Sequence, residues 1–367
     1  MSTPDLFGLS AFSRLGGWLL RLPYAAFAAL ASFLTVIHLG FRLPWQPDDR
    51  YMTLVANWPT GLSWDSSPLW ILLPKVLGAF STWSWNLIWI SIALASLLVV
   101  IWHTPRALPP STQRHFLVTF LASGIPLLLA TRMGLYDNLF VLGVVLTVLL
   151  RSRWWILGCI ITAGSNSELG IAAGLSAFLV GLSLQDKSIR QRALTTVFLS
   201  ALMALLTIFF TAFRGTSTDG SRLALLPSLV GRSLAANLPW FPLIVSTMFL
   251  GSWIVVLVMS FSSLQQKRLL FFLGLVGLPI LLALVTLDGT RVAVSASSLA
   301  FLFSLRWWLS RPEIADALES TPGVAATLLT GIFAALVLTP AVVLFVPVLL
   351  EGFFPPWESL YVLLWPL

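Results

Sequence analysis

Long, continuous apolar runs separated by short polar turns set the pattern of this chain. The runs do not alternate residue by residue, as the strands of an outer-membrane barrel do. A helix that crosses a bilayer needs about 20 mostly apolar residues. We therefore predict eleven transmembrane helices, near 22–41, 84–102, 116–131, 138–150, 154–166, 168–184, 194–213, 239–261, 269–287, 292–309 and 325–350. The shortest, 138–150 and 154–166, are predicted as candidates for half-helices packed within protein.

Composition supports the same class. Of the 367 residues, 58% are hydrophobic and 10% are charged, and the mean hydropathy is +0.93. Soluble domains carry about 25% charged residues, so the surplus apolar side chains must face lipid. The predicted fold class is an all-α polytopic membrane protein, with residues 1–367 forming a single transmembrane domain. The segments outside the helices are a cytoplasmic N-terminal segment (1–21), a first outer loop (42–83) with interfacial helices, and a short outer C-terminal tail (351–367).

The distribution of charge predicts an orientation. With the N-terminus in the cytoplasm, the inner loops hold thirteen basic and five acidic residues, a net charge of +8. The outer side holds eight basic and nine acidic residues, a net charge of −1. Because positive charge collects in cytoplasmic loops, we expect a prokaryotic plasma (inner) membrane protein with an extracytoplasmic C-terminus. The total of +7 then indicates contact with anionic membrane lipids, and no nucleic acid partner is expected.

Cysteine and histidine exclude several chemistries. The single cysteine, Cys159, excludes a disulfide framework and a cysteine-ligated zinc or iron–sulfur site. The three histidines are scattered, with no HExxH motif, so nothing supports zinc hydrolysis.

An acid pair opens the first outer loop. Asp48 and Asp49 follow the first span by a few residues. Two close carboxylates repel, which raises one pKa unless a cation is near. This suits a general base or ligands of a divalent cation, Mg²⁺ or Mn²⁺. The alternative is that the pair caps a short helix starting near Arg50.

The rest of that loop carries a second motif. Ser67-Pro68-Leu69-Trp70 introduces an apolar segment, 68–80, that is too short to span the membrane and is predicted to be an interfacial helix. Within it, Lys75 either extends to lipid headgroups or meets a lipid phosphate.

The acid pair and the Ser-Pro-Leu-Trp segment together resemble the GT-C membrane glycosyltransferases over about residues 23–105. The topology extends the resemblance loosely to about residue 310. This family takes a sugar from a polyprenyl-phosphate lipid on the outer face, and its first outer loop typically carries a functional acid. The resemblance implies that Asp48-Asp49 matches that acid. The chain lacks the C-terminal outer domain of many members, so acceptor recognition stays open among a glycan, a lipid and a protein.

Further polar residues at helix ends are candidate substrate ligands. Arg132, Tyr136 and Asp137 lie between the third and fourth spans, where Asp137 either caps the next helix or binds a sugar together with Tyr136. Glu168 is either a first-turn acid of its helix or a functional group below the interface. Arg291 either pairs with nearby Asp288 or clamps the lipid phosphate with its planar fork of donors. Arg214, Arg222 and Arg232 compete for that phosphate role.

The polar motifs collect on one face, which favours an enzyme acting there. We therefore expect a glycosyltransferase that uses a polyprenyl-phosphate-linked sugar, with Asp49 or Asp48 as general base or metal ligand. A transporter or flippase is the first alternative, and it predicts broken helices and polar residues inside the spans. The second alternative is a lipid-linked glycan polymerase or ligase.

Overall fold

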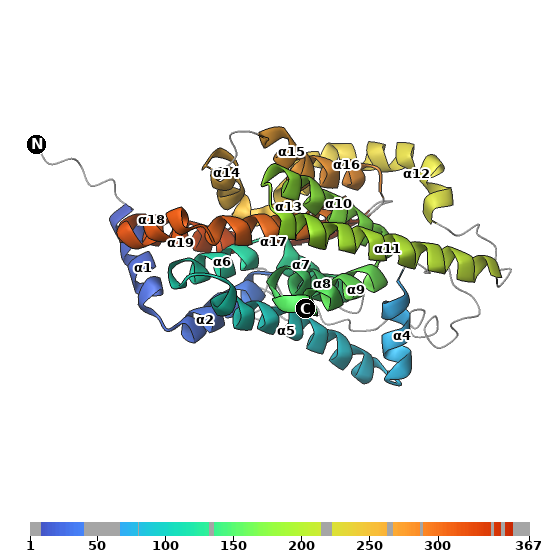
Figure 1. The fold of residues 1–367 in the computed structure, drawn as a ribbon, viewed down its shortest axis with the longest axis horizontal. Coiled ribbons are helices and arrows are strands. Elements are labelled where there is room, and N and C mark those ends of the chain that lie inside the picture. Colours follow the sequence, from blue (N-terminus) through green and yellow to red (C-terminus); the bar gives the residue numbers. More distant parts are fainter. Residues whose placement is uncertain are drawn as a thin grey trace, which may run out of the picture.

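The computed structural model describes residues 9–39, 67–79, 81–131, 136–213, 222–262, 267–286, 289–338, 341–345 and 349–354. Apart from one short hairpin, the elements in these ranges are helices, packed side by side into a bundle (Figure 1). The helices are α1 (Leu9–Arg21), α2 (Tyr24–Leu39), α4 (Pro68–Val76), α5 (Thr82–Ala107), α6 (Pro110–Leu121), α7 (Gly124–Thr131), α8 (Asp137–Leu149), η1 (Ser152–Trp154), α9 (Trp155–Ser165), α10 (Ser167–Ser183), α11 (Lys187–Phe213), α12 (Arg222–Asn237), η3 (Leu238–Trp240), α13 (Phe241–Phe249), η4 (Leu250–Ser252), α14 (Trp253–Ser262), α15 (Arg268–Phe272), η5 (Leu273–Gly277), α16 (Leu278–Leu284), α17 (Gly289–Leu309), α18 (Pro312–Ser320) and α19 (Pro322–Leu338).

Four stretches of the described chain are long and apolar enough to cross a membrane: Thr82–Ala107, Lys187–Phe209, Val230–Phe261 and Gly289–Leu309. Two bent pairs raise this number to as many as six, namely α6 with α7 (55°) and α18 with α19 (103°). The class of membrane protein with apolar helices is therefore supported, whereas the predicted count of eleven spans is not confirmed. Shorter apolar helices account for part of the difference, among them α2, α8 and α10.

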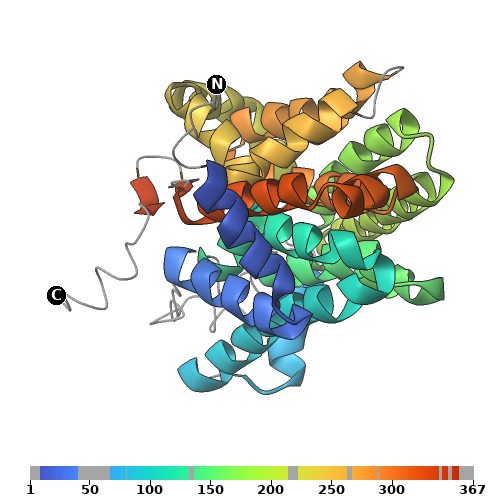
Figure 2. The ribbon, with the colours of Figure 1, turned by 90° about the vertical axis from the view of Figure 1, so that its left-hand side faces the viewer.

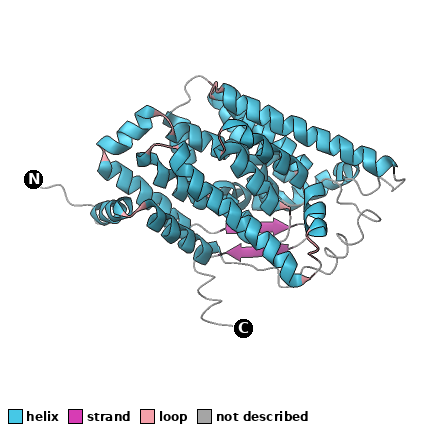
Figure 3. Cartoon of the chain, turned by 60° about the horizontal axis from the view of Figure 1, so that its bottom comes forward, coloured by secondary structure: helices cyan, strands magenta, loops and turns pink. Residues whose placement is uncertain are grey.

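The last predicted helix, 325–350, is wrong in its second half. Helix α19 ends at Leu338, and two antiparallel strands follow, β1 (Ala341–Phe345) and β2 (Leu349–Phe354). Figure 3 shows this hairpin beside the helices. Pro340 lacks a backbone N–H and disfavours helix in the residue before it, and the valine-rich segment after it has high strand propensity. The apolar run therefore continues past the point where the helix stops.

Helix α17 forms the centre of the bundle (Figure 1). Of the residues in its most apolar 18-residue stretch, 89% are buried. Figure 2, turned by 90°, looks onto the end of the bundle formed by α1, α2 and α19. Helix α8 packs on α17 and runs parallel to it. One contact joins their N-terminal parts, between Arg291 and Asp137, and another joins their C-terminal parts, between Arg306 and Val148.

Helices α8 and α9 form a tight antiparallel pair because glycine faces threonine across it. A Cβ on Gly143 would lie 2.5 Å from Thr162 N, and Gly158 abuts Thr147 in the same way. This register places the α9–α10 turn at the end of the bundle where α8 begins. We call that end, which holds the N-termini of α8, α10 and α17, the aspartate end. The opposite end, at the C-termini of α8 and α17, is the arginine end.

Candidate functional site

A buried ion pair lies at the aspartate end. Arg291 Nε lies 3.5 Å from Asp137 Oδ1, and the two side chains are 6% and 0% exposed. Arg291 Nη2 also donates a hydrogen bond to the Tyr136 hydroxyl, and the guanidinium carbon lies 4.9 Å from the centre of the Tyr136 ring. Three candidate residues from two distant parts of the sequence therefore form one cluster, which we call the Arg291 cluster.

Local structure explains why an acid is stable here. Asp137 occupies the first turn of α8, and a carboxylate at a helix N-terminus is favoured by the helix dipole. Arg291 lies in the first turn of α17, where the same dipole disfavours a cation, so Asp137 compensates for its position. Burying two charges costs free energy that their attraction only partly returns. Such a pair within apolar helices is more often functional than structural.

Further buried polar groups lie at the aspartate end. Asn138 Nδ2 donates to Leu129 O at 3.2 Å, and Asn166 Oδ1 accepts from Leu169 N at 2.9 Å, which caps α10. Four further atoms have no hydrogen-bond partner among the described residues, although their side chains are at most 1% exposed: Ser67 Oγ, Asn138 Oδ1, Asn166 Nδ2 and Ser167 Oγ. Unpaired buried polar atoms are costly, so this end of the bundle has spare hydrogen-bonding capacity for a polar ligand.

Glu168 lies in the first turn of α10, half-buried, at the aspartate end. Lys75 lies in the last turn of α4, also half-buried. Helix α4 begins at the predicted position and packs on α9, since a Cβ on Gly164 would lie 2.6 Å from the Leu69 side chain. Asp48, Asp49, Arg132, Asp288 and Arg214 lie outside the described residues. Arg232 is exposed on α12.

Both ends of the first outer loop reach the aspartate end. Leu39, the last residue of α2, packs with Leu127 and Ala130 of α7, shortly before Tyr136. At the other end of the loop, Ser67 precedes α4, which rests on the C-terminal part of α9. The described residues on either side of the segment that carries Asp48 and Asp49 therefore pack on α7 and on the C-terminal part of α9.

Asn237 is a buried residue that the sequence did not single out. Its Nδ2 donates to Ala283 O at 3.0 Å and to Thr286 O at 2.8 Å, which ties α12 to the end of α16 beside Gly289. A lone asparagine near the end of an amphipathic segment carries no signal that would separate this role from an exposed position.

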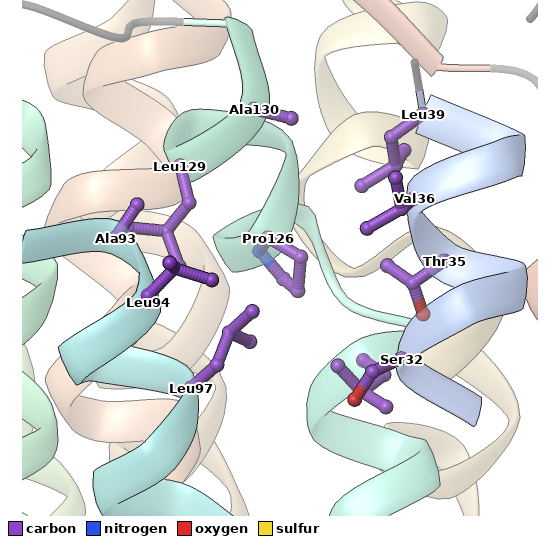
Figure 4. A pocket seen from close by; sticks show the side chains of 11 residues that line it. Ser32, Thr35, Val36, Leu39, Ala93, Leu94, Leu97, Pro126, Leu129 and Ala130 are labelled. Carbon is purple, nitrogen blue, oxygen red and sulfur yellow. The ribbon is translucent and has the colours of Figure 1, made fainter. Parts of the chain in front are cut away.

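An apolar crevice of about 70 Å³ opens between α2, α5 and α7. Figure 4 shows Thr35, Val36 and Leu39 of α2 facing Leu94 and Leu97 of α5 across it, with Pro126 and Leu129 of α7 beside them. Its upper end, at Leu39 and Ala130, coincides with the point where the first outer loop begins. The crevice therefore leads from the apolar flank of the bundle towards the aspartate end.

Within the described residues, no group of three or more His, Cys, Asp or Glu comes together to hold a metal ion. Asp137 does not fit a divalent cation, because its carboxylate is already paired with the Arg291 guanidinium. The predicted ligands, Asp48 and Asp49, lie outside the described range.

Comparison with protein-family models, with curated proteins and with solved structures gave no match to this chain.

Proposed function

We propose that this protein is a membrane glycosyltransferase that moves a sugar from a polyprenyl-phosphate-linked donor to an acceptor at the aspartate end, on the extracytoplasmic face. The observation that supports it best is the Arg291 cluster, in which Tyr136, Asp137 and Arg291 meet at the aspartate end, where Leu39, the last described residue before the predicted first outer loop, packs on α7. The cluster offers a cation for a phosphate and polar groups for sugar hydroxyls.

The proposed reaction is a displacement at the anomeric carbon. The acceptor oxygen forms a bond to that carbon while its proton passes to the carboxylate of Asp49 or Asp48. The bond to the lipid-phosphate oxygen breaks, and its electron pair leaves with the phosphate. Arg291, whose planar guanidinium matches phosphate oxygens, stabilises the departing charge once the phosphate displaces Asp137.

The apolar crevice suits the lipid part of the donor. A polyprenyl chain needs an apolar surface that is continuous with the bilayer, and Val36 and Leu94 at the crevice are 42% and 50% exposed. The crevice ends at Leu39, beside the start of the first outer loop. A chain lying in it would hold its phosphate near the aspartate end.

The length of α8 also fits this use. At 13 residues, the helix is about 20 Å long, whereas the apolar layer of a bilayer is about 30 Å thick. With its C-terminus at the arginine end near one interface, its N-terminus lies below the other interface. The Arg291 cluster is therefore recessed, so a lipid phosphate would leave bulk water on reaching it, and charge interactions strengthen in such surroundings.

The test is sugar transfer in membranes supplied with lipid-linked sugars. Asn keeps the size of Asp without its charge, and losing a general base typically costs ~10²–10⁴-fold in rate. We expect at least one of Asp48→Asn and Asp49→Asn to abolish transfer at unchanged expression, with Asp49 the stronger choice because it abuts the predicted interfacial helix. Full activity in both variants would count against the proposal.

The same assay tests Arg291. Arg291→Lys keeps the charge that pairs with Asp137 but removes the planar fork, so we expect roughly 10²-fold slower transfer. Arg311→Lys is the matched control, because Arg311 pairs with Glu313 at the opposite end of α17. Arg306 is unsuitable as a control, because it donates to Val148 O. Wild-type transfer by Arg291→Lys would leave Arg291 with a structural role alone.

One observation favours a transporter as the second candidate. Two candidate spans are broken, α6/α7 at Ala122–Ser123 and α13/α14 at η4, and the breaks meet. A Cβ on Gly124 would lie 2.8 Å from Met248 O, and Ser252 Oγ donates to Thr119 O. Broken helices deep in a bundle mark substrate sites in transporters. Substrate uptake by proteoliposomes without any sugar transfer would favour this candidate over the enzyme.

A further inference from the structure

The arginine end gathers basic side chains around the C-terminus of α8. Arg192 of α11 donates from Nη1 to Thr147 O at 2.7 Å and to Leu150 O at 3.1 Å, and its guanidinium carbon lies 5.4 Å from the centre of the Trp155 ring. Arg306 of α17 donates to Val148 O, which Arg192 also reaches at 3.3 Å. Because both guanidinium groups bind one carbonyl oxygen, they lie within about 6 Å of each other.

Among the described residues, these two cations are only partly compensated. The C-terminus of a helix offers about half an elementary negative charge, against two full positive charges. Asp186 is the nearby acid, and its Oδ1 already accepts from Ile189 N at 3.0 Å, which caps α11. Both arginines are half-buried, so water screens their repulsion less than it would at an exposed site. An anion bound beside Arg192 and Arg306 would neutralise their remaining positive charge.

Exposed basic residues continue the site outwards. Arg151 and Arg153 flank Ser152 in the turn after α8. Lys187, at the start of α11, and Lys267, before α15, are also exposed. Lys267 lies next to the end of α10, because Ser183 Oγ donates a hydrogen bond to Lys267 O. Arg192 lies five positions into α11 from Lys187, so it sits about 7 Å deeper along the helix axis. The cations therefore form two levels, an exposed outer level and a half-buried inner one.

An apolar surface begins directly below these cations. Trp154, next to Arg153, is 69% exposed, and Ile156, Leu157 and Ile160 of α9 are 37%, 43% and 45% exposed. Tryptophan concentrates at membrane interfaces, and exposed aliphatic side chains on a membrane helix contact acyl chains. An anion with an attached acyl chain fits both surfaces, whereas a free inorganic anion fits only the first.

We propose that the arginine end is a binding site for one anionic phospholipid, whose phosphate lies among Arg151, Arg192 and Arg306 and whose acyl chain follows the exposed face of α9. The site is separate from the Arg291 cluster, at the other end of α8 and α17. Each basic side chain near an anionic headgroup contributes roughly fivefold in affinity. The lipid would fix α8, α9 and α11 against one another.

The experiment uses full-length, delipidated protein in neutral detergent, titrated with phosphatidylglycerol or with phosphatidylcholine. Bound lipid is counted by native mass spectrometry, and the Tm is followed in parallel. We expect one phosphatidylglycerol to bind in preference to phosphatidylcholine and to raise the Tm. The double variant Arg151→Gln/Arg153→Gln removes two exposed cations without touching the caps of α8, and it should bind phosphatidylglycerol roughly 30-fold more weakly.

The matched control is Arg14→Gln/Arg21→Gln, which removes two exposed arginines from α1. This variant should bind phosphatidylglycerol as the wild type does. Equal weakening in both double variants would mean a general charge effect and would overturn the site. Equal binding of the two lipids would also overturn it. If inorganic phosphate alone raises the Tm as much as phosphatidylglycerol, the ligand is a free anion and not a lipid.

Discussion

The pairing of Arg291 with Asp137 joins two residues that lie far apart in the chain; Tyr136, the third member of the cluster, is 155 positions from Arg291. Each was identifiable from the sequence as a charged or aromatic residue at the end of an apolar run. Their contact was not, because it depends on α8 and α17 packing in parallel, which is a tertiary arrangement. The sequence instead offered Asp288 as the local partner of Arg291, whereas the described contact is with Asp137.

A buried pair predicts an asymmetric response to mutation. Removing one partner leaves an uncompensated buried charge and costs about 3–5 kcal/mol, whereas replacing both is often nearly neutral. We expect Asp137→Asn to lower the free energy of unfolding in detergent by about 3 kcal/mol, and Asp137→Asn/Arg291→Met to recover most of that loss. Arg311→Gln, which breaks the exposed pair with Glu313 (3.4 Å), should cost far less, because water screens a surface ion pair. A double variant no more stable than Asp137→Asn would show that the two charges do not compensate each other.

At the scale of elements, apolar runs predicted the helices well but not their breaks. The run 239–261 contains η4, where Leu250 has φ 43°. A leucine rarely adopts this conformation, and no proline signals it. Neighbouring helices stabilise the break: Gly251 lies against Ala335, and Ser252 donates to Thr119 O. Such breaks depend on partners elsewhere in the chain, so the local sequence could not reveal them.

The glycines between α8 and α9 can be tested directly. An added Cβ on Gly143 would lie 2.5 Å from both Thr162 N and Thr162 Oγ1, and overpacking of this kind costs about 1–3 kcal/mol. We expect Gly143→Ala to lower the Tm measured in detergent. The control is Gly231→Ala on α12, where nothing lies within 4 Å, and where better helix propensity should leave stability equal or raise it by up to about 1 kcal/mol. Equal effects in the two variants would contradict the close approach of α8 and α9.

At the scale of the whole molecule, charge separation predicts orientation. The arginine end carries Arg151, Arg192 and Arg306, and the aspartate end carries Asp137 and Glu168 together with Arg291, which is paired with Asp137. Since basic residues are enriched in cytoplasmic loops, a reporter fused after Leu367 should read as extracytoplasmic, and one fused before Met1 as cytoplasmic. A cytoplasmic reading at Leu367 would contradict an active site at the outer face. Composition gave the membrane class, whereas the number of spans depends on how short and bent helices pack, which composition does not encode.

The shortness of α8 and α9 also constrains how the chain is made. With 13 and 11 residues, neither reaches the ~20 apolar residues that carry a single helix into a bilayer. Their backbones touch at Gly143 and Gly158, so each supplies the other with a partner surface. With the arginine end in the cytoplasm, as predicted from the charge distribution, we expect the nascent chain to bring α8 and α9 into the membrane as one hairpin, with Arg151 and Arg153 on the ribosome side. On this expectation, insertion of the region waits until α9 has left the exit tunnel, and its timing is set by translation beyond Ser165.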